Sequence, residues 1–203
     1  MVNAQKFNSV TEAALYLSRV VREDLLKQIS IYGKAVLVMP GGQSIKPFFP
    51  YFIKLGVDWS KIIIGLSDER CVPLDDAMSN EKQLRQLFLD FIPNYNYNPL
   101  REEFLLKIRE TPPITILSMG IDGHVASLFP EEAGDWKNTG GIGIFRTKKQ
   151  DPNRVSLTEE VLLLSSKMYL LVVGKEKKQF IDEKLLFSFP LYSVFNAAIL
   201  IKC

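Results

Sequence analysis

Short apolar runs recur along the chain and are separated by longer segments in which apolar and polar residues mix. Runs rich in β-branched or aliphatic residues lie at 34–39, 61–66, 114–117, 168–173 and 197–201. Uninterrupted apolar runs of this length are typical of strands that are buried on both faces of a sheet. The pattern therefore predicts buried strands at these positions, and further strands are expected at 142–145 and 154–157.

The segments between these runs carry apolar residues at helical spacing. Ser9 and Glu12 fit a capping box, so the first helix is expected to begin there and to reach about Ile29. Ser79 is expected to cap a helix over residues 80–91. Further helices are expected at 46–55, 100–108, 158–165 and 175–187.

Strands that alternate with helices indicate an α/β fold. We predict a Rossmann-like arrangement, in which a mostly parallel, twisted sheet is covered by helices on both faces. The chain has 203 residues, of which 47% are hydrophobic, and this is enough for one core. Because no segment has the composition of a linker, we predict a single domain over residues 1–203.

Charge and cysteine usage exclude several classes of function. The formal net charge of +2 is too small to indicate nucleic-acid binding, and no patch combines aromatic with basic residues. No apolar run approaches the ~20 residues of a membrane-spanning helix, and the N-terminus lacks the apolar core of a signal peptide. Cys71 and Cys203 are expected to be free thiols in a reducing compartment, and no metal site is expected.

The segment after the strand at 114–117 contains the strongest candidate for chemistry. Gly120 and Gly123 permit a tight turn, and His124, the only histidine of the chain, follows them directly. A helix is expected to begin at His124 and to include Leu128. A side chain at such a strand end lies at the carboxyl edge of the sheet, where α/β folds bind ligands. We therefore interpret His124 as a proton acceptor, the alternative being a buried structural histidine.

Other strand ends supply candidate anion-binding groups. The turn at residues 41–44 joins a strand to a helix and has the arrangement of a phosphate cradle, although a plain turn is equally compatible with it. Asp68, Glu69 and Arg70 follow a buried strand, either as ligand contacts or as a solvated loop. Arg154 and Lys177 are further cations, which spacing alone would assign to the surface.

Several of these segments match one family in order. The matching segments are 40–47, 68–80, 119–130, 154–158 and 174–177. They resemble the SGGSTPKP, DERxVPxDDxxSN, GMGxDGHxASLFP, RVTLT and GxxK signatures of the 6-phosphogluconolactonase family, within the wider group that includes glucosamine-6-phosphate deaminase. Gln43 and Ile45 depart from the first signature, which has a small polar residue and a proline there.

The resemblance implies a cytoplasmic enzyme of the oxidative pentose phosphate pathway, which hydrolyses 6-phospho-D-glucono-1,5-lactone to 6-phospho-D-gluconate without metal or cofactor. It implies that His124 activates water for attack on the lactone carbonyl and that Asp68 and Asp122 complete the catalytic set. The substrate-binding positions that it implies are Gly41, Gly42, Gln43, Ser44, Arg70, Gly123, Arg154 and Lys177. The partner would be a small phosphorylated sugar lactone, and we expect a monomer or a weak homodimer.

Two alternatives stay open on the sequence. A deaminase or isomerase would resemble the GIGxDGHIAFNEP signature, in which a glutamate stands where this chain has Phe129. A non-catalytic sugar-phosphate sensor would need the cationic groups but not His124. The sequence also leaves open which of Lys175, Lys177 and Lys178 faces the ligand.

Overall fold

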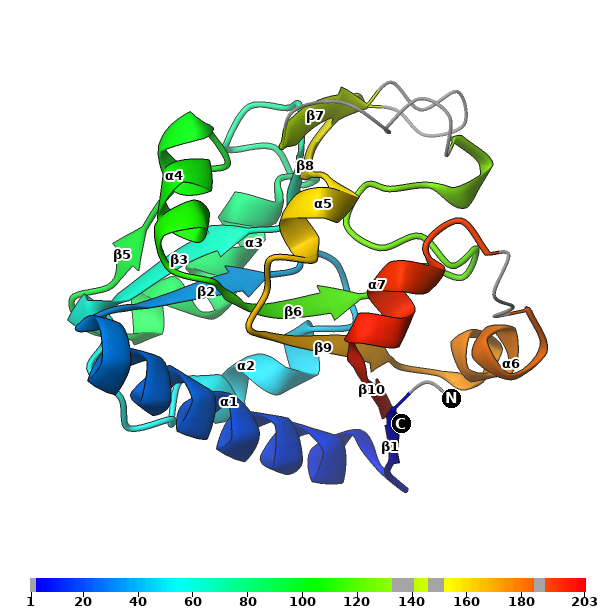
Figure 1. The fold of residues 1–203 in the computed structure, drawn as a ribbon, viewed down its shortest axis with the longest axis horizontal. Coiled ribbons are helices and arrows are strands. Elements are labelled where there is room, and N and C mark those ends of the chain that lie inside the picture. The colour runs from blue at the N-terminus through cyan, green and yellow to red at the C-terminus, as the bar shows by residue number, and fades with distance from the viewer. Residues whose placement is uncertain (1–2, 133–140, 146–151, 185–188) are drawn as a thin grey trace.

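A parallel sheet of seven strands lies at the centre of the part of the chain that the structure describes (Figure 1). The computed structural model describes residues 3–132, 141–145, 152–184 and 189–203. In spatial order the strands are β1 (Ala4–Lys6), β10 (Ile199–Lys202), β9 (Lys167–Val172), β6 (Ile114–Ser118), β2 (Ala35–Met39), β3 (Ile62–Leu66) and β5 (Asn96–Tyr97). The strands predicted from apolar runs are all confirmed. The edge strands β1 and β5 were not predicted, because they are short and largely polar.

Helices cover both faces of this sheet, which confirms the predicted α/β architecture (Figure 1). They are α1 (Val10–Tyr32), α2 (Phe49–Phe52), α3 (Asn80–Leu87), α4 (Glu102–Glu110), α5 (Glu159–Leu162), α6 (Lys175–Lys184) and α7 (Tyr192–Ala197). None of the helices within the described ranges is long and apolar enough to cross a membrane.

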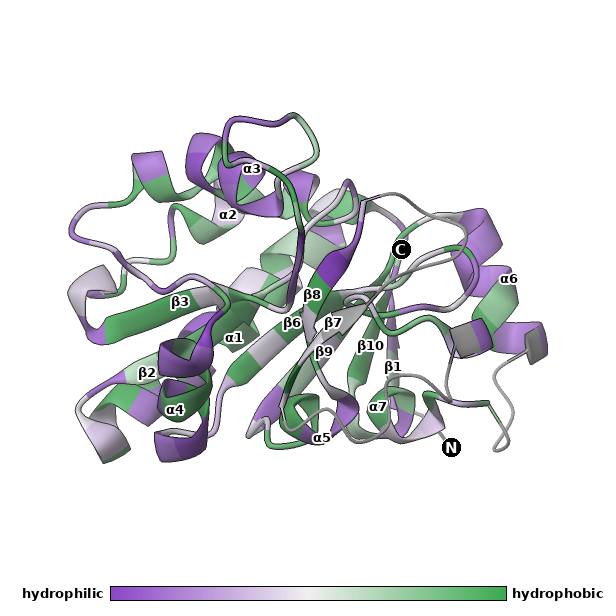
Figure 2. Cartoon of the chain, turned by 90° about the horizontal axis from the view of Figure 1, so that it is seen from above, coloured by the Kyte–Doolittle hydropathy of each residue, from purple (hydrophilic) through white to green (hydrophobic). Residues whose placement is uncertain are grey.

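The core lies in two layers because neighbouring strand residues point to opposite faces. Along β2, Leu37 and Met39 belong to the cluster that α1, α2 and α3 cover, whereas Val36 and Val38 belong to the cluster that α4, α5 and α7 cover. Figure 2 shows the central strands as largely hydrophobic, with hydrophilic residues gathered on helices outside them. Burial on both faces is the reason that the strands read as continuous apolar runs.

The N-terminal cap of α1 is formed as predicted. Ser9 Oγ accepts a hydrogen bond from the Glu12 backbone N–H at 3.1 Å, and Glu12 Oε2 accepts one from the Asn8 backbone N–H at 3.0 Å. The helix ends at Gly33, whose φ of +70° provides a left-handed cap. It is one turn longer than the predicted end at Ile29.

We expect Ser9→Ala to lower the free energy of unfolding by about 1 kcal/mol, because a backbone N–H of the first turn loses its acceptor. Urea unfolding followed by circular dichroism measures this. Ser18→Ala is the matched control, since Ser18 lies within α1 and its hydroxyl bonds only to the Leu15 carbonyl. Equal destabilisation by the two changes would contradict a capping role for Ser9.

Three helix predictions were wrong in extent. The segment 46–55 forms a 3₁₀ turn (Lys46–Phe48) followed by the short α2, since Pro47 and Pro50 supply no backbone N–H for a longer helix. The predicted helix at 158–165 is confined to α5, and that at 80–91 divides into α3 and a 3₁₀ turn at Leu89–Phe91. Helix α7 was not predicted.

A small antiparallel sheet stands apart from the central one, and it carries charged side chains of the site. Within the described residues it consists of β4 (Asp68–Arg70), β8 (Arg154–Leu157) and β7 (Ile142–Phe145), in the order β4-β8-β7. The strands expected at 142–145 and 154–157 are confirmed. Strand β4 was not predicted, because its three charged residues were interpreted either as ligand contacts or as a solvated loop. The register pairs Arg70 with Arg154, which brings two arginines from distant segments side by side.

Candidate active site

A cavity of about 230 Å³ opens at the carboxyl ends of β2, β3 and β6. Ligands bind at this edge in open α/β sheets. The predicted site residues that line it are Gly41, Gly42, Gln43, Ser44, Asp68, Arg70, His124, Arg154 and Lys177. Asp122 and Gly123 belong to the turn that carries His124 and are not part of the lining.

The turn between β6 and His124 depends on its glycines. The Gly120 backbone N–H donates to the His124 carbonyl at 2.8 Å, and Gly123 has a φ of +85°. A Cβ at Gly120 would overlap the His124 ring, so the glycine allows the imidazole to lie against the backbone.

The predicted helix from His124 to Leu128 does not form. Val125 makes bridges to both Met119 and Leu128, and Ala126 has a φ of +50°. The segment therefore folds back on the end of β6. Its apolar residues are buried by this fold-back, so their spacing was misread as the start of a helix.

Asp122 orients the His124 ring. The distance between His124 Nδ1 and Asp122 Oδ1 is 2.6 Å, and the same oxygen accepts the His124 backbone N–H at 3.2 Å. Burial alone would raise the pKa of Asp122, but the hydrogen bonds and charge of His124 outweigh burial and lower that pKa. Asp122 is thus a carboxylate that can only accept, so Nδ1 carries the proton and Nε2 is the acceptor nitrogen of the neutral ring.

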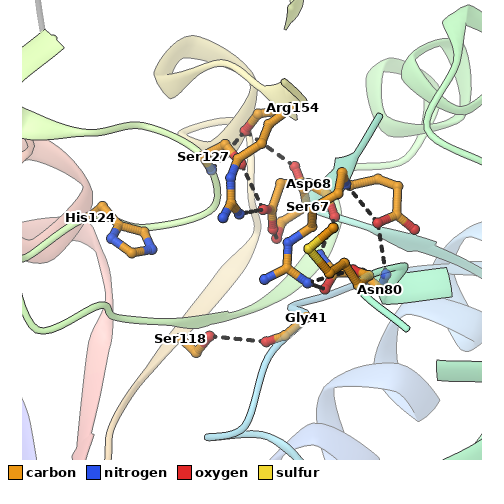
Figure 3. A network of polar contacts seen from close by, with 12 residues as sticks. Gly41, Ser67, Asp68, Asn80, Ser118, His124, Ser127 and Arg154 are labelled. Carbon is orange, nitrogen blue, oxygen red and sulfur yellow. Dashed lines mark hydrogen bonds and ion pairs between the residues drawn. The ribbon is translucent and has the colours of Figure 1, made fainter. Parts of the chain in front are cut away.

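Arg70 and Arg154, paired across β4 and β8, form a cationic wall of the cavity that His124 also lines. Figure 3 shows Arg154 and His124 on different sides of the site. Arg70 donates from Nη1 to the Met78 carbonyl at 2.8 Å and to Asn80 Oδ1 at 2.5 Å. Arg154 Nη1 lies 3.7 Å from Asp68 Oδ2. Burial, followed by the neighbouring charge of Arg70, lowers the pKa of Arg154, which the nearby carboxylates only partly oppose. An anion in the cavity would relieve this repulsion between like charges.

Asp68 lines the cavity, and both oxygens of its carboxylate accept hydrogen bonds from serine hydroxyl groups. Oδ1 accepts from Ser67 Oγ at 3.1 Å and Oδ2 accepts from Ser127 Oγ at 2.7 Å. The Asp68 side chain is 7% exposed. These contacts hold the carboxylate in place beside Arg154.

Sequence reasoning did not single out Asn80 or Ser118, which also line the cavity. Asn80 Nδ2 donates to the Asp68 carbonyl at 2.9 Å, and Ser118 Oγ donates to the Gly41 carbonyl at 3.3 Å (Figure 3). Both lie next to local signals: Asn80 follows the helix cap Ser79, and Ser118 directly follows the predicted strand at 114–117.

We expect Gly41→Ala to destabilise the fold by about 1 kcal/mol, as overpacking typically does. A Cβ at Gly41 would overlap the Asn80 amide, which its bonds to Arg70 and the Asp68 carbonyl hold in place. Chemical unfolding of Gly41→Ala in the wild-type and Asn80→Ala backgrounds measures the effect. The cost should be smaller where Asn80 is absent, and an equal cost in both backgrounds would contradict the contact.

Lys177 is the lysine that faces the cavity. Its Nζ donates to Ser44 Oγ at 2.9 Å, which joins α6 to the turn after β2. Burial lowers the pKa of Lys177, and the charge of Asp122 opposes this only in part. Lys175 and Lys178 instead line a separate hollow beside the end of β1. Of these three lysines, Lys177 is the one that lines the cavity, and its contact with the ligand stays a prediction.

The remaining candidate groups form no further centre in the described ranges. There, no group of three or more His, Cys, Asp or Glu side chains lies close enough together to hold a metal ion. Cys71 is exposed and Cys203 is buried, both as free thiols. That no cofactor is needed stays a prediction.

Comparison with known proteins points to one family. A sequence profile described as glucosamine-6-phosphate isomerases/6-phosphogluconolactonase matches residues 8–188. A 6-phosphogluconolactonase from Thermotoga maritima is 32% identical over 173 residues, which cover 77% of each chain. Another, from Neisseria meningitidis, is 29% identical over 199 residues and covers 88% of this chain and 86% of that protein.

Solved structures share the fold. The crystal structure of a 6-phosphogluconolactonase from Shewanella baltica superposes with a TM-score of 0.87 at 23% identity and covers 98% of this chain and 96% of that one. A monomeric glucosamine-6-phosphate deaminase superposes with a TM-score of 0.78 at 14% identity over 98% of this chain and 95% of that one. Because both activities occur on this fold, the fold does not distinguish them.

Proposed function

The chain belongs to the glucosamine-6-phosphate isomerase/6-phosphogluconolactonase family, and from that premise we propose that it hydrolyses 6-phospho-D-glucono-1,5-lactone to 6-phospho-D-gluconate. Relatives that carry the name 6-phosphogluconolactonase match most of the chain at 29–32% identity. The observation that carries the proposal is the His124–Asp122 pair on one side of a cavity whose other walls hold Arg70, Arg154 and Lys177.

His124 serves as the general base. Its Nε2 takes a proton from a water molecule while the water oxygen attacks the lactone carbonyl carbon, and the carbonyl oxygen becomes an oxyanion. When this tetrahedral intermediate collapses, the bond between the carbonyl carbon and the ring oxygen breaks. The ring oxygen then takes the proton from the imidazolium, so that the open acid forms and neutral His124 is restored. Asp122 stabilises the transient imidazolium and keeps its orientation.

The cationic walls recognise the charged ends of the substrate. The 6-phosphate binds between Arg154, Lys177 and the turn at 41–44, where Gly42 with its φ of +83° shapes the backbone. Arg70 lies beside Arg154 and stabilises the developing oxyanion. The volume of about 230 Å³ suits a small polar molecule.

The deaminase alternative finds less support in the site. Deamination and isomerisation require a second group that moves protons along the sugar chain. At the position where that branch has a glutamate, the chain has Phe129, whose ring packs 4.5 Å from the His124 ring. An apolar side chain there carries no proton.

An assay of purified protein tests the proposal. The lactone is generated in place, and acid release is followed at constant pH beside a blank that measures spontaneous ring opening. Ammonia release from glucosamine 6-phosphate is measured in parallel. We expect acid release well above the blank and no ammonia; ammonia release alone would replace the proposal with the deaminase alternative.

A further inference from the structure

Ser127 joins the turn that carries His124 to the antiparallel sheet that carries the arginines. Its Oγ donates to Asp68 Oδ2 at 2.7 Å, and its backbone N–H donates to Ser156 Oγ at 3.2 Å. Asp68 and Ser156 face each other in the β4–β8 register. Ser127 therefore contacts both β4 and β8, the two strands that carry the arginines. Its own segment begins at His124, the proposed general base.

The Ser127 hydroxyl has no exposure to solvent and no direct place in the cavity lining. Its partner Asp68 lines the cavity and forms the ion pair with Arg154, with an Oδ2–Nη1 distance of 3.7 Å. A short hydroxyl hydrogen bond on the carboxylate oxygen that faces Arg154 holds this carboxylate in one rotamer. The Ser127 hydroxyl thus bonds to the same carboxylate oxygen that pairs with the Arg154 guanidinium.

We propose that Ser127 is a positioning residue for anion recognition: its hydroxyl fixes Asp68, and Asp68 in turn fixes Arg154 toward the phosphate of the substrate. The inference rests on the proposed function for the identity of the substrate, but it concerns phosphate binding, which can be measured without turnover.

Two variants separate the hydrogen bond from the packing. Ser127→Ala removes the hydroxyl, and Ser127→Cys keeps a side chain of similar size that is a weak donor. We expect both to raise the KM for the phosphorylated lactone about tenfold, the size of one lost hydrogen bond to a charged group. The KM for unphosphorylated glucono-1,5-lactone should stay unchanged, because it carries no phosphate for Arg154 to bind.

Calorimetric titration with inorganic phosphate gives a readout that does not depend on hydrolysis. The Kd should rise about tenfold in both Ser127 variants. In an Arg154→Ala background, Ser127→Ala should have no further effect on the Kd, since the residue through which it acts is missing. Ser165→Ala is the matched control: its hydroxyl bonds to Thr115 and the Leu162 carbonyl, away from the cavity, and should leave the Kd unchanged.

Different failures have different meanings. Phosphate binding without hydrolysis by the wild-type protein would remove the lactonase proposal and leave the role of Ser127 standing. Equal effects of Ser127→Ala on the two lactones, an undiminished effect in the Arg154→Ala background, or no phosphate binding by the wild-type protein would each overturn the positioning role.

Discussion

Replacing His124 with alanine is expected to slow hydrolysis of the phosphorylated lactone by about 10²- to 10⁴-fold, the usual contribution of a positioned general base. The ring is removed from the cavity while Asp122 and the cationic walls stay, so kcat should fall much more than KM changes. Initial rates over a range of lactone concentrations, corrected for spontaneous opening, measure this.

The pH profile provides an independent check on the same residue. Because the pKa of Asp122 is lowered, Asp122 remains charged as the pH falls from 8 to 5, and its stabilising hydrogen bond is lost only when the pH falls through that lowered pKa. Any decline of kcat/KM over this range must therefore come from a group other than Asp122. The decline should be absent in His124→Ala. A variant that keeps wild-type rates, or the same acid decline, would exclude His124 as the base.

Replacing Arg154 with alanine is expected to raise the KM for the phosphorylated lactone about 100-fold, since charge-assisted hydrogen bonds to a phosphate contribute roughly 1.5–3 kcal/mol each. The KM for unphosphorylated glucono-1,5-lactone should change little, because it presents no charge to the arginine wall. Paired kinetic measurements on the two lactones give the ratio directly.

Two further variants distinguish a lost phosphate contact from a general loss of structure. Arg22→Ala removes the same charge from α1, where the guanidinium donates to the Leu55 carbonyl at 2.9 Å, and should leave both KM values unchanged. Arg154→Lys retains a cation without the planar fork and should be intermediate. An equal rise of KM for the two lactones in Arg154→Ala would show that Arg154 does not read the phosphate.

Several features of the fold followed from local sequence. The apolar run that became β2 is buried on both faces, so it needs no partner to be recognised as a strand. Ser9 and Ser79 cap their helices through residues only a few positions away. The tight turn before His124 was predicted from its two glycines, because glycine permits such turns and a close approach of the backbone. The structure shows both effects: Gly123 has a φ of +85°, and the imidazole lies against Gly120.

Pairings between distant segments decided the rest. The sequence around Arg70 does not predict strand β4, because three charged residues in a row are not typical of a strand. The pairing of β4 with β8 nevertheless places Arg70 beside Arg154. Lys175, Lys177 and Lys178 look alike in the sequence, and only the docking of α6 turns Lys177 toward Ser44. The helix expected at His124 was wrong because fold-back contacts of Val125 outweighed local spacing.

The sequence by itself determined the alternation of strands and helices, the capped helix starts and the glycine turn that presents His124, since each depends on short-range sterics and hydrogen bonds. Only the tertiary structure decided that Asp68 is held by Ser127 and that two arginines share one wall, because those contacts join segments that meet only when the sheets assemble. Burying such charges is tolerable only where every partner is in place, and this requires the whole fold.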